Sequence, residues 1–221
     1  MLSGNFSNSP LTGFPHWNLK RKDLSGEIKE LVSRRSFDIL FFSETTQKTR
    51  KALDEVLRPM GYTHRTQLLG NVRVALFEKY QQSEILLIKE ERRFTIIIYN
   101  FGGEKYTVVG VHLDSPVSYP DESDRYVVAK DEYSTIAFYI ETYKVNNMVI
   151  IGDFNMHPFD RGMVSELSFK ATHCKQTAQA LSKGKDYLFN PSWKIFSNDL
   201  TEAEKNHQAL FIMYRETRIL M

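Results

Sequence analysis

Apolar residues recur at helical spacing in two stretches of the first sixty residues, and a continuous apolar run separates these stretches. Between residues 24 and 35 apolar side chains alternate with charged ones every three or four positions, which predicts a helix. Residues 37–42 form the apolar run, which has the length of a buried strand and stops at a polar Ser-Glu-Thr. A second helical pattern ends at Pro59 and Gly61. The order helix, buried strand, helix indicates an α/β layered domain.

A β-rich region follows, in which four runs are separated by short polar or glycine-bearing turns. The runs are Val72–Phe77, Ile85–Ile88, Phe94–Tyr99 and Tyr106–His112. Runs of this length with such turns predict an antiparallel meander. A third amphipathic helix is predicted around Lys130–Val145, and a weaker helical pattern lies near Lys170–Leu181. No repeat or linker divides the chain, so one domain is the simpler interpretation.

The most informative stretch lies between these last two helices. It is a short apolar strand, Val149–Ile151, that ends at Gly152. Asp153 and Asn155 follow at alternate positions, and because strand side chains alternate, both are expected to point to one side. A carboxylate beside an amide at the mouth of a buried strand suits a hard metal ion and an activated water. The alternative is an Asx-turn, in which both side chains bind only backbone groups.

Three other strand-like runs end on a polar residue that can take part in catalysis, namely Asn18, Glu44 and His112. Sites in layered α/β folds gather at strand ends, so we expect these residues to converge with Asp153. Each has a structural alternative: Glu44 as the N-terminal charge of a helix, His112 as a core histidine, and Asn18 as an ordinary loop residue. The complete set favours a site, because it is less frequent by accident than any one member.

Composition and charge restrict the function only a little. A formal net charge of +2 permits nucleic-acid binding without predicting it. The single Cys174 excludes an intramolecular disulfide and a cysteine-rich metal site, and it fits a reducing, cytoplasmic compartment. No apolar stretch has the length of a membrane span. Residues 1–15 lack a secretory signal and are expected to be a loop or disordered lead-in.

The segments around the polar strand ends resemble the signature blocks of the endonuclease/exonuclease/phosphatase superfamily, which has the DNase I-like fold. They occur in the family's order and are Trp17-Asn18-Leu19, Phe42-Ser43-Glu44-Thr45, Val111-His112-Leu113-Asp114-Ser115 and Gly152-Asp153-Phe154-Asn155. The region from Gly152 to Phe159, with the later Asn190–Trp193, resembles a bacterial branch of uncharacterised members. The resemblance implies an α+β fold, specifically a four-layer α/β/β/α sandwich of two sheets with helices outside.

The resemblance also implies a role for each residue in the hydrolysis of phosphate esters with Mg²⁺ or Mn²⁺. Glu44 would be the main metal ligand, with Asn18 nearby in the metal and phosphate shell. Asp153 would orient or deprotonate the attacking water, and Asn155 would hold the scissile phosphate. His112 would hydrogen-bond a phosphate oxygen or assist the leaving group. These roles agree with the preference of Mg²⁺ for oxygen ligands and of histidine for proton transfer near neutral pH.

The chain departs from the family at both ends. The family closes its site with a C-terminal Asp-His or Asp-Gln block, for which only His207 is a candidate here, without a buried strand before it. Residues 209–221 form an atypical tail, which we expect to be translated out of frame, with the C-terminal strands missing. Pro15 and His16 replace the apolar strand that relatives carry before Trp-Asn. Because proline cannot donate to a sheet ladder, the first strand should be short or at an edge.

The sequence therefore predicts a phosphoesterase domain over residues 16–208, specifically a metal-dependent nuclease that hydrolyses phosphodiester bonds. Its partner would be nucleic acid or another phosphate ester. Two alternatives stay open: a phosphomonoesterase of inositol or lipid phosphates, and a truncated remnant with weak or no activity. Basic pairs such as Arg92-Arg93 give the nucleic-acid prediction only weak support, since such runs are usually solvated faces.

Overall fold

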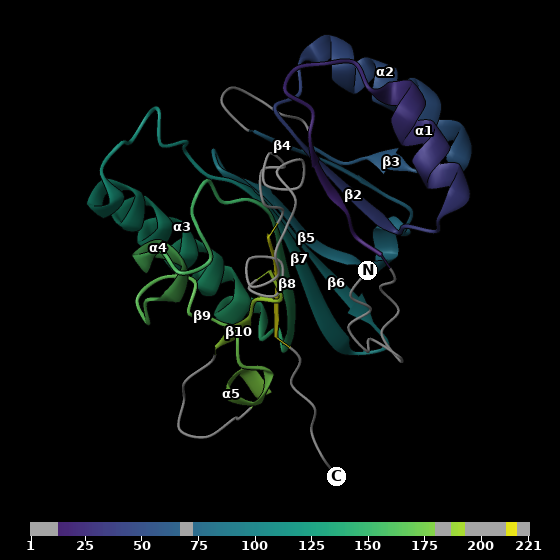
Figure 1. Ribbon diagram of the computed structural model, residues 1–221. Coiled ribbons are helices and arrows are strands. Elements are labelled where there is room, and N and C mark those ends of the chain that lie inside the picture. Colours follow the sequence, from purple (N-terminus) through teal and green to yellow (C-terminus); the bar gives the residue numbers. More distant parts are fainter. Residues whose placement is uncertain (1–12, 67–72, 180–186, 193–210, 216–221) are drawn as a thin grey trace.

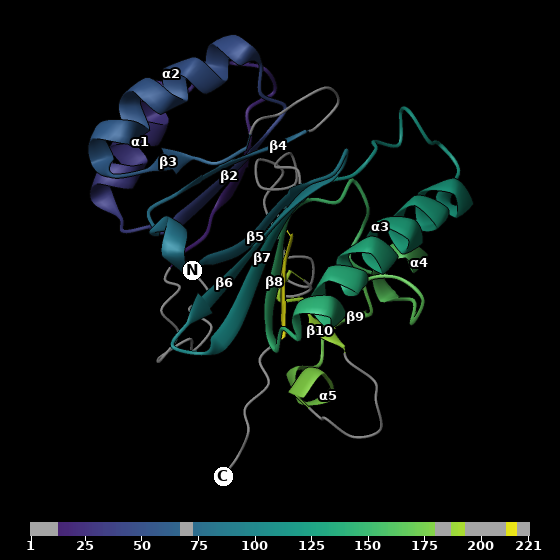
Figure 2. The same ribbon diagram turned by 180° about the vertical axis from the view of Figure 1, so that it is seen from behind.

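Two β-sheets pack face to face at the centre of the molecule, and helices cover the outer face of each sheet (Figures 1 and 2). This computed structural model describes residues 13–66, 73–179, 187–192 and 211–215. The arrangement confirms the predicted α+β class and the four-layer α/β/β/α sandwich. Because each sheet is covered on both faces, its central strands are apolar on both sides.

The smaller sheet contains four strands in the order β1-β2-β4-β3. They are β1 (His16–Asn18), β2 (Ile39–Ser43), β4 (Val74–Glu78) and β3 (Thr63–His64). β1 has only three residues and lies at the edge, parallel to β2, which confirms the expectation drawn from Pro15. The carbonyl of Pro15 accepts a hydrogen bond from the backbone N–H of Phe41 at 3.0 Å, so the proline joins the sheet through its acceptor alone.

The predicted four-run meander is wrong for its first run. β4 pairs antiparallel with β2 and so belongs to the smaller sheet, whereas the other three runs form the meander β5-β6-β7 in the larger sheet. The apolar pattern of β4 does not differ from that of its successors. Its partner β2 lies on the other side of a helix in the sequence, and such a distant pairing leaves no local signal.

The larger sheet contains seven strands in the order β5-β6-β7-β8-β11-β10-β9. They are β5 (Ile85–Glu90), β6 (Phe94–Phe101), β7 (Glu104–His112), β8 (Asn147–Asp153), β11 (Phe211–Arg215), β10 (Leu188–Phe189) and β9 (Ala171–Thr172). β7 and β8 are parallel neighbours, and His112 lies opposite Asp153. This register brings the ends of both strands to the same edge of the sheet.

Part of the atypical tail belongs to the larger sheet. The backbone of β11 pairs antiparallel with β8 from Phe211, opposite Gly152, to Arg215, opposite Met148. The tail therefore supplies a strand that covers the edge of β8. Its translation out of frame, with loss of the family's own C-terminal strands, stays a prediction. His207 and the rest of residues 193–210 and 216–221 lie outside the described part of the chain.

Helices form the two outer layers (Figure 1). α1 (Ser25–Arg34) and α2 (Gln47–Leu57) cover the smaller sheet, while α3 (Glu122–Tyr143) and α4 (Arg161–Val164) cover the larger one. The short elements are α5 (Lys175–Gln179) and the 3-10 turns η1 (Arg58–Met60) and η2 (Gln82–Glu84). The helix predicted near Lys170–Leu181 is wrong in extent, because Lys170 has a left-handed backbone (φ 49°) and β9 follows it before α5 begins.

Three apolar cores hold the layers together: one under α1 and α2, one between the sheets, and one under α3. Gly110 of β7 lies directly against the ring of Phe41 of β2, in the core between the sheets. A Cβ atom at Gly110 would lie 2.2 Å from the ring of Phe41, so only glycine fits there. Among the described helices, none is long and apolar enough to cross a membrane.

Candidate active site

The polar strand ends of both sheets meet at one edge of the sandwich. Asn18 is the last residue of β1 and lies opposite Ser43, the last residue of β2, which Glu44 follows. His112 and Asp153 are the last residues of β7 and β8. Because β1 and β2, and likewise β7 and β8, run parallel, each pair delivers its C-terminal residues to the same edge. The predicted convergence of these side chains therefore occurs.

Glu44 is presented by a turn directly after β2. Its backbone has a φ of 50°, in the left-handed region that residues other than glycine seldom occupy. The backbone N–H of Arg21 donates to the carbonyl of Glu44 at 2.9 Å, which ties this turn to the segment after β1. α2 begins only after its N-cap residue Thr46, whose side chain accepts a hydrogen bond from Thr49. Helix capping therefore does not account for Glu44.

Asn18 links the two carboxylates of the site. Its Nδ2 donates to Oε1 of Glu44 at 2.9 Å and to Oδ2 of Asp153 at 3.1 Å. Its Oδ1 accepts from the backbone N–H of Lys20 at 2.9 Å. If the side-chain amide of Asn18 were flipped, its oxygen would face both carboxylates and repel them. The hydrogen bonds therefore fix which way this amide points. The amide nitrogen thus faces the carboxylates, and the assignment of Asn18 as a metal ligand stays a prediction.

Asp153 and Asn155 make the Asx-turn and also face the site. Oδ1 of Asp153 accepts from the backbone N–H of Asn155 at 3.1 Å, while its Oδ2 accepts from Asn18. Asn155 has a φ of 52°, and its Nδ2 donates to the carbonyl of Leu113 at 2.9 Å. The two interpretations of the sequence are compatible, because the turn itself sets the direction of the carboxylate.

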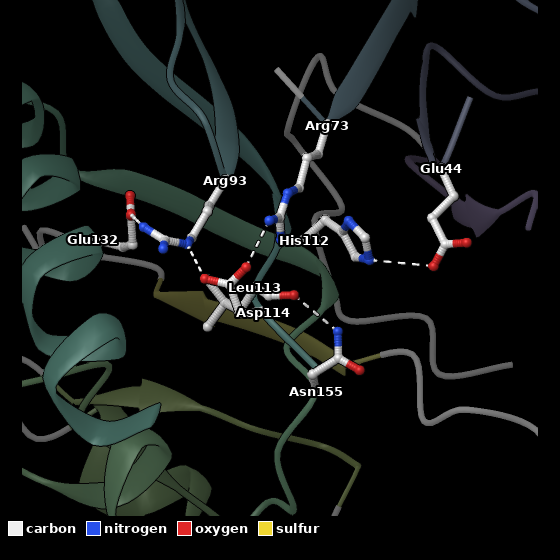
Figure 3. A network of polar contacts seen from close by, with 8 residues as sticks. All are labelled: Glu44, Arg73, Arg93, His112, Leu113, Asp114, Glu132 and Asn155. Carbon is white, nitrogen blue, oxygen red and sulfur yellow. Dashed lines mark hydrogen bonds and ion pairs between the residues drawn. The ribbon is translucent and has the colours of Figure 1, made fainter. Parts of the chain in front are cut away.

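His112 approaches Glu44 from the larger sheet (Figure 3). Its Nε2 lies 3.5 Å from Oε1 of Glu44, and its imidazole is largely buried. Burial lowers the pKa of His112, although the carboxylates of Asp153 and Glu44 oppose this effect. The ring is therefore neutral at pH 7 and carries one N–H, which suits donation to a substrate oxygen.

Two arginines hold one aspartate beside His112 (Figure 3). Oδ1 of Asp114 lies 2.6 Å from Arg73, and its Oδ2 lies 2.5 Å from Nε of Arg93. Arg93 also contacts Oε1 of Glu132 on α3 at 2.7 Å. Burial alone would raise the pKa of Asp114, but its bonds to both arginines outweigh burial and lower it. The site is thus braced from β4, β6 and α3.

No local pattern in the sequence indicates this network of Asp114 with two arginines. The side chain of Arg93 is only 14% exposed and doubly paired, so the interpretation of Arg92-Arg93 as a solvated face is wrong for its second member. Asp114 stands inside the His112 block, and a buried carboxylate requires a cation. That signal was readable, but the identity of the partners was not, because Arg73 and Arg93 come from two different sheets.

The oxygen donors fit a magnesium or manganese ion held by few protein ligands. The side chain of Glu44 is 35% exposed, and its Oε2 makes none of the contacts above. In the described ranges no group of three or more His, Cys, Asp or Glu side chains is arranged to hold a metal ion by itself. Mg²⁺ usually keeps several waters and binds through one or two carboxylates and substrate phosphates, so this open set suits it.

Several solved structures share this architecture. An endonuclease/exonuclease/phosphatase family protein from Bacteroides thetaiotaomicron matches with a TM-score of 0.61 at 15% identity, over 91% of this chain and 82% of that chain. The chain has the endonuclease/exonuclease/phosphatase fold. No protein-family model matches the sequence, and no curated protein matches it.

Other proteins with the endonuclease/exonuclease/phosphatase fold match equally well and differ in what they act on. D. rerio TDP2 complexed with a single-strand DNA product matches at 13% identity and a TM-score of 0.59, over 94% of this chain and 85% of that chain. A Bacteroides thetaiotaomicron mannosyl-6-phosphatase matches at 15% identity and a TM-score of 0.59, over 91% and 84%. The fold is therefore shared across substrates, and the chemistry of this chain must be argued from its own site.

Proposed function

We propose that this protein is a metal-dependent phosphoesterase that hydrolyses phosphodiester bonds of nucleic acid by attack of water on phosphorus. The observation that carries the proposal is the bridge from Asn18 to both Glu44 and Asp153. Two carboxylates repel each other, so a donor that fixes both at the open edge of the sandwich indicates a purpose beyond folding. Hydrolysis of a phosphate ester uses such a pair of carboxylates, one to bind the metal ion and the other to orient the attacking water.

Glu44 would hold the metal ion, and Asn18 would keep its carboxylate in place. When bound, Mg²⁺ or Mn²⁺ offsets the negative charge that gathers on the phosphoryl oxygens. Glu44 suits this role because it is partly exposed and only one of its oxygens is bound by Asn18. Asn18 acts here through its amide nitrogen, which lowers the repulsion between Glu44 and Asp153.

Asp153 would orient the attacking water and accept its proton. Both of its oxygens already accept a hydrogen bond, one from Asn18 and one from the backbone of Asn155, so the carboxylate cannot rotate freely. Asn155 uses one N–H of its amide on the carbonyl of Leu113, and its second N–H can donate to the scissile phosphate. Fixed orientation of both groups is what makes proton transfer efficient.

His112 and Arg73 would contact the phosphate from the larger-sheet side and from β4. The neutral imidazole of His112 can donate from Nε2 to a phosphoryl oxygen or to the departing oxygen. The side chain of Arg73 is 27% exposed and is anchored by Asp114, which leaves further N–H groups of the guanidinium for an anion. The site thus offers a phosphate one donor beside Glu44, from His112, and further donors from Arg73.

A nucleic-acid substrate is supported by the TDP2 structure with its DNA product, which has the same fold. A phosphomonoesterase is the second candidate, supported equally by the mannosyl-6-phosphatase. The test incubates the purified chain with Mg²⁺ or Mn²⁺ and plasmid DNA, single-stranded oligonucleotides, inositol phosphates or hexose 6-phosphates. We expect cleaved DNA, and expect chelation by EDTA to stop cleavage. Phosphate release from the monoesters with intact DNA would replace the nuclease assignment by the second candidate.

Matched variants separate this site from a contaminant. Glu44→Gln and Asp153→Asn keep the shape of each side chain and should each lower turnover about a hundredfold. Glu30→Gln, on the exposed face of α1, removes the same charge away from the site and should keep turnover. If both site variants cleave as well as the unaltered chain, the activity does not belong to these residues.

A further inference from the structure

Three buried polar atoms under the site have no hydrogen-bond partner among the described residues. They are Nε2 of His16, Oγ of Ser43 and Nδ1 of His112. Ser43 is fully buried, and the two histidines are 6% and 8% exposed. Unpartnered buried polar groups are infrequent in folded proteins, and each requires a physical explanation. Because three of these atoms lie in one region, we expect one explanation to account for all three.

The strands direct these three side chains into the space between the sheets. His16 lies on the same face of β1 as Asn18, which reaches Asp153 of the opposite sheet, whereas Trp17 between them packs under α1. Ser43 shares its face of β2 with Phe41, a member of the core between the sheets. His112 shares its face of β7 with Gly110, which contacts Phe41. The three residues therefore lie between the two sheets, near the edge at which the strands end in the candidate active site.

His16 and His112 are close enough to influence each other electrically. Burial and the neighbouring His112 together lower the pKa of His16 to about 3. A neutral imidazole offers one donor and one acceptor nitrogen. His112 places Nε2 toward the carboxylate of Glu44, which favours the proton on Nε2 and leaves Nδ1 as an acceptor.

We propose that His16 and Ser43 are positioning residues that hold a water molecule against Nδ1 of His112 and so fix its tautomer. The water donates a hydrogen bond to Nδ1 of His112. Nε2 of His16 and Oγ of Ser43 make the other hydrogen bonds to this water. A buried water typically makes about three hydrogen bonds, which equals the number of unpartnered atoms here. With Nδ1 occupied, the proton stays on Nε2, where it faces Glu44 and the site.

This assignment gives His16 a purpose that the sequence did not show. Pro15-His16 was read only as a departure from the apolar strand of relatives, because histidine in a short edge strand carries no signal of its own. Its consequence for catalysis rests on the proposed function. The tautomer of His112 does not, because it can be measured without any substrate.

The first test reads the tautomer of His112 by long-range ¹H–¹⁵N correlation spectra of the ¹⁵N-labelled, metal-free protein. Proton-bearing and bare ring nitrogens resonate in separate ranges, and His112→Gln assigns the signals among the six histidines. We expect the unaltered chain to show the Nε2–H form. His16→Leu should produce a mixture with the Nδ1–H form, Ser43→Ala a smaller shift in the same direction, and His16→Gln, which keeps a polar side chain, little change.

Matched controls remove a histidine and a hydroxyl elsewhere. His64→Gln alters a histidine at the other edge of the smaller sheet, and Thr107→Val removes a buried hydroxyl that donates to Ile97. Neither should shift the signals of His112. An unchanged tautomer in folded Ser43→Ala and in any folded His16→Leu, or an equal shift in the controls, would overturn the proposal.

The second test follows turnover of a substrate identified by the assay above. His16→Leu should lower kcat about tenfold and leave KM within about twofold, since orientation of His112 acts on the reaction rather than on binding. His16→Gln should restore most of kcat. A chain that hydrolyses no phosphate ester refutes the proposed function while the spectra still decide the role of His16. An unaltered kcat in His16→Leu alongside an altered tautomer would remove His16 from the catalytic argument.

Discussion

Acid should destabilise this protein through His16 over a defined pH range. The folded chain buries the imidazole and holds its pKa at about 3, whereas an exposed histidine has a pKa of 6.5. Below pH 6.5 the unfolded chain therefore binds a proton that the folded chain does not. Since stability rises with pH wherever the unfolded state binds more protons, the free energy of unfolding must fall as the pH falls from 6.5 toward 3.

The size of this effect follows from the two pKa values. Each unit between them is worth about 1.4 kcal/mol. At pH 5 the solution lies 1.5 units below the unfolded pKa of 6.5, so His16 lowers the free energy of unfolding by about 2 kcal/mol relative to pH 7. The complete effect, reached below pH 3, is about 5 kcal/mol. A domain with an ordinary stability of about 5–15 kcal/mol would lose a substantial part of it.

Urea unfolding at several pH values, in buffer with a chelator, measures the effect. His64 and His112 also have pKa values lowered by burial, so the unaltered chain alone cannot isolate His16. The useful quantity is the stability difference between the unaltered chain and His16→Gln, which cannot titrate at this position. Between pH 7 and pH 5 we expect the unaltered chain to lose about 2 kcal/mol more of its free energy of unfolding than His16→Gln loses. A difference that is constant with pH refutes the buried, neutral state of His16.

Three further predictions concern packing and charge. Gly152→Ala should lower stability by about 4 kcal/mol in urea unfolding, because a Cβ would lie 2.0 Å from the carbonyl oxygen of Val111 and the backbone there has a φ of 152°. Gly110→Ala should cost about 1–3 kcal/mol by crowding the Phe41 ring, and Gly110→Ala with Phe41→Leu should recover part of it. Asp114→Asn should cost about 3 kcal/mol and lower the melting temperature, since it leaves two arginines without their main partner; an unaltered melting temperature would show that the network is not structural.

The sequence predicted the parts of the site that local patterns encode. Asp153 and Asn155 were found because a buried strand, a glycine and two alternating polar residues lie within one short segment. Glu44 was found for the same reason, at the end of another apolar run. Their gathering within each sheet also followed, because parallel strands end at one edge. The packing of the two sheets then brings the two groups together. The order of these elements indicated only a layered α/β domain. The four-layer α+β sandwich followed from the resemblance of the polar strand ends to the superfamily.

The parts that the sequence did not predict depend on distant partners. The four β-rich runs look alike, yet pairing assigns β4 to the smaller sheet, and no local feature of its residues indicates this. Arg93 was read as a surface cation because its partners Asp114 and Glu132 lie elsewhere in the chain. The role of Asn18 needed coordinates for another reason. Only the full hydrogen-bond network shows that its nitrogen, rather than its oxygen, meets the carboxylates.

β1 is the shortest of the four strands that end at the site, yet its Asn18 connects both carboxylates of the site. It has three residues, and proline restricts it to an edge, yet its Asn18 reaches the opposite sheet. Asn18 joins Glu44 of one sheet to Asp153 of the other, so it fixes the distance between two groups that would otherwise repel. His16 lies on the same face of β1 and is near enough to His112 for the two rings to influence each other electrostatically. An edge strand can do this because its own sheet constrains it on one side only, which lets its side chains settle against the neighbouring sheet.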